Sequence, residues 1–206
     1  MPELPGGVRG ALSSTRLVDT SVGPARVSLA GSGKALLVLG HGAGGGTDTW
    51  DLIAARAAAL ELGWRVALVD QPWRVRGAKV AEAPARLDIA WVEVLRTLRS
   101  KKLVVGGRSA GARVACRTAA EVGADGVLCL AFPLHPPGRP DTSRAHELLL
   151  PTVPVAVIQG ERDAFGVPAG AVVIPGANHS FTVPKAFDPP IPQITGAVRD
   201  FLQTLT

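Results

Sequence analysis

The stretch that most constrains this chain is a short apolar run that ends in glycine and leads directly into a serine. Residues 103–105 are Leu-Val-Val, and Gly107, Ser109 and Gly111 follow in the pattern Gly-x-Ser-x-Gly. The β-branched run predicts a buried strand, and the alanine-rich segment that begins at Ala110 predicts a helix. So tight a turn holds the serine in a strained backbone conformation and requires glycine two residues away on either side. The stretch therefore predicts a nucleophile elbow with Ser109 as the candidate nucleophile.

Buried strands alternate with amphipathic helices along the rest of the chain. Besides the elbow strand, the expected strands are residues 35–40, 65–70, 126–132, 154–160 and 171–175, preceded by a hairpin at 16–20 and 26–30. The expected helices are residues 50–62, 83–100, 110–122, 143–150 and 191–205. This alternation predicts an α/β fold with a doubly wound, mostly parallel sheet and an N-terminal hairpin. Because no repeat or internal linker interrupts it, residues 15–206 are expected to form a single domain after a flexible lead-in over residues 1–14.

The composition is typical of a globular chain and indicates neither a membrane segment nor a secretory signal. Hydrophobic residues make up 47% of the sequence and charged residues 19%. No apolar run approaches the roughly 18–20 residues that span a bilayer. The first residues lack a basic region followed by an apolar stretch, so the expected location is the cytoplasm. Cys116 and Cys129 lie in apolar surroundings and are expected to be buried thiols, not a disulfide or a metal site.

The net charge of +5 and the pI near 9.9 raise the question of an acidic partner. The arginines are spread along the sequence rather than gathered into one run, which favours a solvated surface over a nucleic-acid interface. We expect no nucleic-acid partner and no membrane partner. The sequence leaves open whether the positive charge selects an anionic substrate, and it does not indicate an oligomeric state.

Three chemically active side chains follow expected strands. Ser109 follows the elbow strand, and Asp163 and His179 follow the last two strands of the chain. Because the carboxyl ends of parallel strands meet at one edge of a sheet, we expect these side chains to gather there. A serine hydroxyl is a weak nucleophile until an imidazole takes its proton, and the imidazole needs a carboxylate to fix its tautomer. The order Ser–Asp–His predicts Ser109 as nucleophile, His179 as general base and Asp163 as orienting carboxylate, with Glu161 as the alternative carboxylate.

A glycine-rich loop follows the first strand of the expected parallel sheet. Residues 41–46 read His-Gly-Ala-Gly-Gly-Gly. In enzymes with a nucleophile elbow, the residue after the serine donates one backbone N–H to the oxyanion and this loop donates another. We expect Ala110 to provide the first N–H, and Ala43 or alternatively Gly44 to provide the second. His41 precedes the serine in the chain and is expected to fix the loop rather than to act as the base.

Several further residues stand where a substrate pocket is expected. Trp73 and Arg74 follow the strand at 65–70, and His135 lies in a proline-rich loop. We expect all three to line the pocket, with surface packing as the alternative for Trp73 and Arg74 and a purely structural role in a rigid loop as the alternative for His135. Arg108, directly before the nucleophile, is expected to be a buried structural arginine in preference to a group that binds a substrate carboxylate.

Four segments carry a resemblance to a known family: His41-Gly42-Ala43-Gly44, Gly107-Arg108-Ser109-Ala110-Gly111, Phe132-Pro133-Leu134-His135-Pro136-Pro137-Gly138 and Gln159-Gly160-Glu161-Arg162-Asp163. From about residue 16 to the end, the chain resembles α/β-hydrolases. It is most similar to small, uncapped bacterial hydrolases related to dienelactone-hydrolase-like proteins. The resemblance implies the α/β-hydrolase fold. The short segment 133–153 leaves no room for an inserted cap domain, which predicts an open, shallow site for small or exposed acyl groups.

These features predict a serine hydrolase that cleaves an ester, thioester or related acyl bond of a small-molecule substrate, most simply a carboxylesterase, without metal or cofactor. One alternative is a non-catalytic binding or regulatory protein, because the resembling family includes eukaryotic proteins that serve as regulators. The other is dinucleotide binding, because residues 40–45 match Gly-x-Gly-x-x-Gly and Asp70 ends the next strand. That reading leaves Ser109, Asp163 and His179 unexplained.

Overall fold

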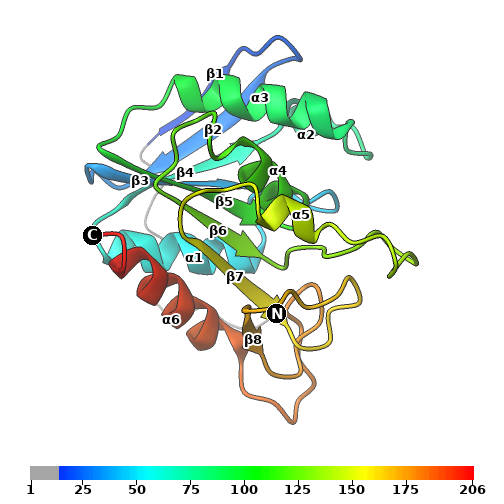
Figure 1. The fold of residues 1–206 in the computed structure, drawn as a ribbon. Coiled ribbons are helices and arrows are strands. Elements are labelled where there is room, and N and C mark those ends of the chain that lie inside the picture. Colours follow the sequence, from blue (N-terminus) through cyan, green and yellow to red (C-terminus); the bar gives the residue numbers. More distant parts are fainter. Residues whose placement is uncertain (1–13) are drawn as a thin grey trace.

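Eight strands form one sheet in the computed structural model, which describes residues 14–206 (Figure 1). The strands are β1 (Ser14–Val18), β2 (Ala25–Ala30), β3 (Ala35–Gly40), β4 (Arg65–Asp70), β5 (Lys102–Arg108), β6 (Gly126–Leu130), β7 (Val155–Gly160) and β8 (Val172–Ile174). They lie in the order β1-β2-β4-β3-β5-β6-β7-β8. β1 and β2 form an antiparallel hairpin that joins β4, and all other pairs are parallel. The predicted mostly parallel sheet with an N-terminal hairpin is confirmed.

Helices cover both faces of this sheet (Figure 1). The helices of the described chain are α1 (Trp50–Glu61), α2 (Pro72–Val75), α3 (Pro84–Arg96), α4 (Ala110–Thr118), α5 (Ala145–Leu148) and α6 (Pro190–Gln203). α1 and α6 pack together on one face, and α3 and α4 pack on the other. None of the helices within residues 14–206 has the length and apolar character needed to cross a bilayer. The flexible lead-in predicted for residues 1–14 lies outside the described residues, except for Ser14, which begins β1.

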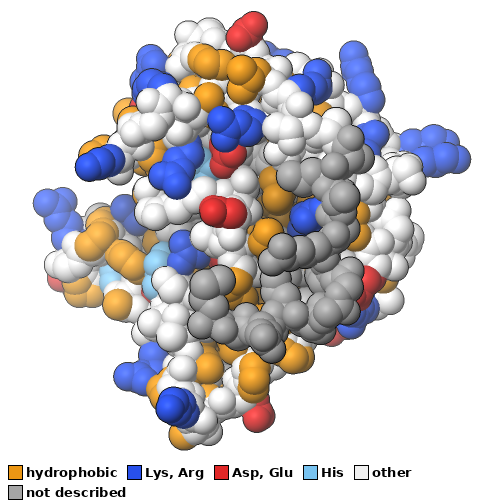
Figure 2. All heavy atoms as spheres, turned by 180° about the vertical axis from the view of Figure 1, so that it is seen from behind, with side chains coloured by type: hydrophobic (Ala, Val, Ile, Leu, Met, Phe, Trp, Pro, Cys, Tyr) orange, Lys and Arg blue, Asp and Glu red, His pale blue; other side chains and the backbone are white. Residues whose placement is uncertain are grey.

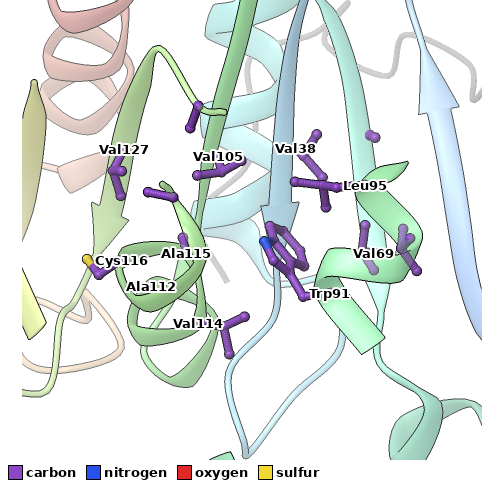
Figure 3. Packing of buried hydrophobic residues seen from close by; sticks show 14 of the residues in the cluster. Val38, Val69, Trp91, Leu95, Val105, Ala112, Val114, Ala115, Cys116 and Val127 are labelled. Atoms are coloured by element: carbon purple, nitrogen blue, oxygen red, sulfur yellow. The ribbon is translucent and has the colours of Figure 1, made fainter. Parts of the chain in front are cut away.

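The core consists of two apolar layers on either side of the sheet. Successive side chains of β3 alternate between them: Leu36 and Val38 face α3 and α4, whereas Leu37 and Leu39 face α1 and α6. All four are fully buried, which explains why this strand reads as a continuous apolar run instead of an alternating one. Figure 3 shows the layer that faces α3 and α4, where valines of the four neighbouring strands β4, β3, β5 and β6 lie near Trp91 of α3 and the small side chains of α4.

Cys116 of α4 and Cys129 of β6 lie inside the same layer, as expected. Both are buried and free, with their sulfur atoms 3.5 Å apart. The hydrogen bond with Cys116, together with burial, raises the pKa of the Cys129 thiol well above its ordinary value. The thiol is therefore kept in its protonated and unreactive form at neutral pH.

The chain reverses its direction of winding at β3. β3 pairs with β4 on one side and with β5 on the other, so the loops that leave β3 and β5 diverge at their carboxyl ends. In open α/β sheets a crevice forms at such a switch point, and ligands bind there. The two loops are residues 41–46 and the elbow at Ser109. The topology thus brings together the two segments that the sequence analysis singled out.

Candidate active site

Ser109 occupies a strained turn between β5 and α4. Its φ of 52° and ψ of −109° lie in a region that side-chain-bearing residues rarely adopt, at a cost of about 1–3 kcal/mol. Its backbone N–H donates to Leu130 O at 2.9 Å, which ties the turn to β6. The flanking glycines are required by close approach, because a Cβ on Gly107 or Gly111 would lie 2.4 or 2.5 Å from the carbonyl oxygen of Gly40. Three glycines thus let the elbow pack directly on the end of β3.

Replacing Gly111 by alanine is expected to destabilise the fold, because its Cβ would meet backbone atoms that cannot move aside. We expect a loss of about 1–3 kcal/mol in the free energy of unfolding, measured by chemical denaturation. Gly196→Ala in α6 is the matched control, since a Cβ there meets nothing within 4 Å. The control is expected to gain about 0.5–1 kcal/mol. Equal effects of the two substitutions would contradict this account of the elbow.

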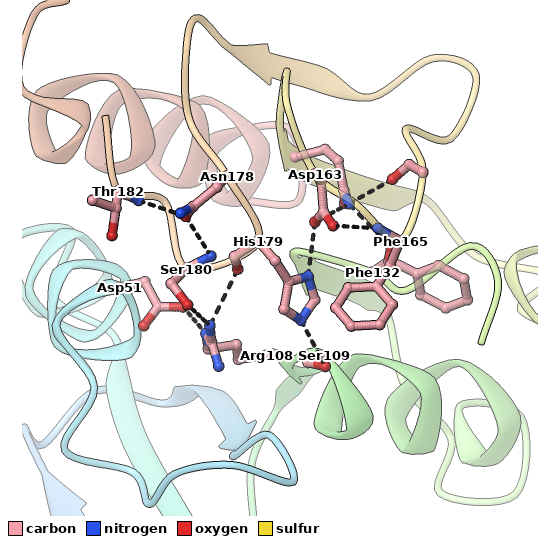
Figure 4. Close-up of polar contacts among 12 residues, drawn as sticks. Asp51, Arg108, Ser109, Phe132, Asp163, Phe165, Asn178, His179, Ser180 and Thr182 are labelled. Atoms are coloured by element: carbon pink, nitrogen blue, oxygen red, sulfur yellow. Dashed lines mark hydrogen bonds and ion pairs between the residues drawn. The ribbon is translucent and has the colours of Figure 1, made fainter. Parts of the chain in front are cut away.

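Ser109, His179 and Asp163 form a chain of contacts across the carboxyl edge of the sheet (Figure 4). His179 Nε2 lies 3.1 Å from Ser109 Oγ, and His179 Nδ1 lies 2.8 Å from Asp163 Oδ2. The carboxylate side chain is fully buried, whereas the imidazole is 20% exposed. These contacts suit a neutral imidazole that donates from Nδ1 to the carboxylate and accepts the serine proton at Nε2. Glu161, the alternative carboxylate, is exposed and instead accepts the backbone N–H of Gly176 at 2.7 Å.

The Asp163 carboxylate is held by two further donors. The backbone N–H of Phe165 donates to Oδ1 at 2.8 Å, and the side-chain amide of Gln159 donates to Oδ2 at 2.7 Å. The Phe165 ring packs edge-on against the His179 ring, with centroids 4.4 Å apart. The same Gln159 amide also reaches the carbonyl oxygens of Phe132 and Gly166 at 3.1 and 2.9 Å. This amide thus joins the ends of β6 and β7 around the carboxylate.

No role was predicted from the sequence for Gln159 or Phe165. A weak signal for Gln159 was present, because it is the one polar side chain in the otherwise apolar strand β7 and is fully buried. A buried polar side chain at a strand end needs hydrogen-bond partners, so it points to a network. No comparable signal marked Phe165, which lies in a loop.

Two backbone segments offer free N–H groups near Ser109. Ala110 is the first residue of α4, and its N–H forms no hydrogen bond within residues 14–206. The N–H groups of Ala43 and Gly44, at the exposed tip of the loop over residues 41–46, also lack a partner in this part of the chain. A Cβ on Gly42 would lie 3.4 Å from Ser109 Cβ, so the loop passes directly over the nucleophile. These amides are available to a developing oxyanion.

His41 anchors that loop from beneath. Its Nδ1 lies 2.8 Å from Gly42 O, and its Nε2 accepts the backbone N–H of Gln71 at 3.1 Å. The second contact requires an unprotonated Nε2 and hence a neutral ring. Burial lowers the pKa of His41, although the Gly42 carbonyl and the Asp70 carboxylate act in the opposite direction. His41 therefore stays neutral at neutral pH and joins the loop to the end of β4.

The lowered pKa of His41 predicts a pH-dependent stability. As the pH falls below 6.5, the ordinary value for histidine, the unfolded chain binds a proton at this residue that the folded protein does not. The free energy of unfolding should therefore fall until the pH reaches the pKa of the folded state. Thermal unfolding from pH 7.5 to 5 should show a steeper loss for the wild type than for His41→Gln. His146→Gln, at an exposed position, is the control that should keep the wild-type slope.

The three residues expected to line the pocket lie in different surroundings. Trp73 is 2% exposed, and its ring lies 5.3 Å from that of His41. The one-turn helix α2, which begins at Pro72, places the ring under the loop, where it is buried and lines a small cavity together with Ala110 and Gly111. Arg74 is exposed and lies against Gly46 at the end of the loop. His135 is half-buried, and its backbone N–H donates to Phe165 O at 3.2 Å, which places it beside the segment that packs on His179.

An apolar groove of about 570 Å³ lies beside the turn that carries His179. Trp50 and Phe181 face each other across part of it, with ring centroids 6.2 Å apart. The partly exposed Phe187 also lines it. A second cavity, of about 10 Å³, lies under the loop over residues 41–46, between His41 and Trp91. It is large enough only for a water-sized group.

The surroundings of Asp70 do not fit the hypothesis of a dinucleotide-binding site. Its carboxylate accepts the Thr47 hydroxyl at 3.2 Å and lies 3.5 Å from Arg26. The topology also differs from that of a dinucleotide-binding fold, in which the third parallel strand pairs with the second: here the third parallel strand, β5, pairs with the first, β3, and the antiparallel β2 lies beside β4.

Charges on the surface are dispersed on the face that Figure 2 shows. Lysine and arginine side chains are scattered over its edge and its interior and do not form one continuous patch. Within residues 14–206, no three histidine, cysteine, aspartate or glutamate side chains are grouped as metal ligands.

Several solved structures that resemble this fold are described as hydrolases. An alpha-beta serine hydrolase homologue from Coxiella burnetii superposes with a TM-score of 0.73 at 16% identity, covering 93% of this chain and 98% of that one. A serine hydrolase without lid from Xanthomonas campestris gives 0.71 at 21% identity, covering 99% and 97%. A dienelactone hydrolase from Anabaena variabilis gives 0.66 at 16% identity, covering 95% and 99%. At these identities the likeness establishes the fold.

A search of curated proteins finds no significant match. A family model described as an alpha/beta hydrolase domain matches residues 33–189, which is most of the chain. The match spans the loop over residues 41–46, the elbow and the segment with Asp163 and His179, so the resemblance seen in the sequence is confirmed. This protein belongs to the alpha/beta hydrolase domain family.

Proposed function

We propose that this protein is a serine hydrolase that cleaves an ester, thioester or related acyl bond through a covalent acyl-enzyme. The observation that carries the proposal is the continuous contact from Ser109 Oγ to His179 and on to the buried Asp163. A neutral imidazole in this position can take the serine proton as the hydroxyl attacks. The carboxylate then stabilises the imidazolium that forms.

The proposed reaction has two half-reactions. Ser109 Oγ attacks the acyl carbonyl carbon while its proton passes to His179 Nε2, and the N–H groups of Ala110 and Ala43 stabilise the oxyanion. His179 returns the proton to the leaving alcohol or thiol, which leaves an acyl-serine ester. A water molecule then gives a proton to His179 and attacks the acyl carbon. His179 passes this proton to Ser109 Oγ as the acyl–oxygen bond breaks, which releases the carboxylic acid and restores the free serine. Each backbone donor of an oxyanion hole contributes about 2.7–4 kcal/mol to the lowering of the barrier.

The proposed substrates are small molecules with an accessible acyl group. Between β6 and β7 the chain contains only the single-turn helix α5, with no inserted cap domain over the site. The solved structure from Xanthomonas campestris is likewise described as lacking a lid. An open site gives little enclosure to a long acyl chain, so carboxylesterase activity on short acyl groups is the proposed specificity.

Hydrolysis of a series of p-nitrophenyl esters tests this specificity. We expect turnover of the acetate and butyrate, with kcat/KM falling as the acyl chain lengthens to decanoate or longer. A rise in kcat/KM with chain length would contradict the proposed preference. An absence of turnover for every ester, thioester and activated amide would favour the non-catalytic binding protein instead.

A further inference from the structure

Arg108 lies next to Ser109 and contacts the turn that carries His179 (Figure 4). It is the last residue of β5 and directly precedes Ser109. Its Nε lies 2.9 Å from Asp51 Oδ2, at the start of α1. Its Nη2 donates to His179 O at 3.1 Å and to Ser180 Oγ at 3.1 Å. One guanidinium therefore joins the elbow, the turn that carries the base, and the helix that follows the oxyanion loop.

The ion pair between Arg108 and Asp51 is more deeply buried than surface ion pairs. The side chain of Arg108 is 12% exposed and that of Asp51 is 2% exposed. Removing two charges from water costs several kcal/mol, and replacing such a pair by apolar side chains is often neutral or stabilising. Net stability is therefore a poor explanation for the pair. The fixed geometry that it imposes is a better one, because the planar guanidinium holds several donors in one rigid arrangement.

The turn that carries His179 has no regular secondary structure of its own. The Asn178 side chain accepts the N–H groups of Ser180 and Thr182 at 2.9 and 3.0 Å, which closes the turn internally. Phe181 adopts a positive φ of 54° within it. Within residues 14–206, the His179 carbonyl accepts a hydrogen bond only from Arg108. Arg108 thus fixes the backbone of the base, and Asp163 fixes its ring.

We infer that Arg108, oriented by Asp51, is a positioning residue that keeps His179 Nε2 within hydrogen-bonding distance of Ser109 Oγ. The inference rests on the proposed hydrolase function. Because Arg108 and Ser109 are adjacent in the chain, the contact sets the base relative to the nucleophile itself. A displacement of about 1 Å between reacting groups can cost about 100-fold in rate. Arg108 acts through the His179 backbone and takes no part in the proton transfer.

Arg108→Lys is the most informative substitution. It keeps the positive charge but replaces the branched donor set by one ammonium group, which cannot reach both Asp51 and the His179 carbonyl in the same geometry. We expect kcat to fall by about 10- to 100-fold with KM close to that of the wild type. Asp51→Asn should have the same kind of effect. The double variant should be no slower than the more impaired single variant, because both substitutions disrupt one contact.

Arg117→Lys is the matched control. Arg117 lies further along α4, its side chain is 16% exposed, and it forms ion pairs with Asp88 and Glu147. It tests the cost of losing a buried arginine away from Ser109. Thermal unfolding of all variants establishes that they fold. The inference predicts that Arg117→Lys keeps the wild-type kcat even where its loss of thermal stability equals that of Arg108→Lys.

A spectroscopic measurement separates this inference from the proposed function. In the wild type, the His179 Nδ1 proton in contact with Asp163 should give a downfield, slowly exchanging proton resonance. Arg108→Lys should broaden or lose this resonance, whereas Arg117→Lys should retain it. This outcome would support the positioning role even if the wild type hydrolysed nothing, in which case the proposed function alone would fail.

Two results would overturn the inference. One is a folded Arg108→Lys protein with both the wild-type kcat and the wild-type resonance. The other is a large rise in KM with kcat and the resonance unchanged, which would make Arg108 a substrate-binding group.

Discussion

Ser109→Ala is expected to lower kcat for a short p-nitrophenyl ester by about 10⁶-fold, because the variant has no oxygen that can form the acyl-enzyme. The fold should persist, since the backbone N–H of residue 109 still donates to Leu130 O. The strained φ of 52° is present with either side chain. Steady-state kinetics with the purified variant measures the loss, and circular dichroism checks the fold.

Ser143→Ala is a suitable control for the nucleophile. Ser143 is exposed, and within residues 14–206 its hydroxyl accepts only the nearby backbone N–H of Ala145. This variant should retain wild-type kinetics. Activity in Ser109→Ala close to that of the wild type would mean that a different group attacks the substrate, and the proposed mechanism would be wrong.

Asp163→Asn is expected to lower kcat by about 10⁴-fold and to weaken the contact with the Gln159 amide, which donates to Asp163 Oδ2 in the wild type. The asparagine is close in size to aspartate, but its NH₂ group can face His179 Nδ1. That contact forces the imidazole proton onto Nε2. A protonated Nε2 can no longer accept the serine proton. The substitution also removes the negative charge that stabilises the imidazolium. The pH dependence of kcat, measured across neutral pH, should show residual activity recovering only at alkaline pH, where hydroxide replaces the general base.

Glu161→Gln is the matched control for that substitution. It lies two residues away and makes the same change of charge, but its carboxylate contacts the Gly176 N–H and not His179. Its kcat should stay within about threefold of the wild type, as expected for an exposed carboxylate outside the site. If the two effects were reversed, Glu161 would be the orienting carboxylate.

Much of the fold could be predicted from the sequence because buried parallel strands leave a local pattern. The strands at 35–40 and 65–70 were predicted with the boundaries that the structure shows, since both of their faces are covered and their residues are apolar apart from Arg65 and Asp70 at the two ends of the second strand. The ends of helices were harder. The helix expected to reach residue 100 ends at Arg96, where the following Thr97 turns its hydroxyl back to Val94 O. The one-turn helix α2 was missed because four residues carry no periodicity.

Only the part of the candidate site that follows from chain order and from the ends of strands was predictable. They indicated which residues stand at the carboxyl edge, and the structure brings Ser109, His179 and Asp163 together there. Contacts between distant segments leave no such pattern. Arg108 and Asp51 are 57 positions apart in the printed sequence, and nothing in either neighbourhood indicates the other. The depth at which Trp73 is buried was not predictable for the same reason, because its ring packs against His41 from another loop.

The central claim, that Ser109 is a nucleophile activated by His179, is tested most directly by reaction of the wild-type protein with a fluorophosphonate and measurement of its intact mass. The account predicts one phosphonyl adduct on the wild type, mapped to Ser109 by peptide analysis. It predicts no adduct on Ser109→Ala and a strongly slowed reaction of His179→Ala. A folded wild type that remains unmodified, or an adduct that maps to another residue, would contradict the claim.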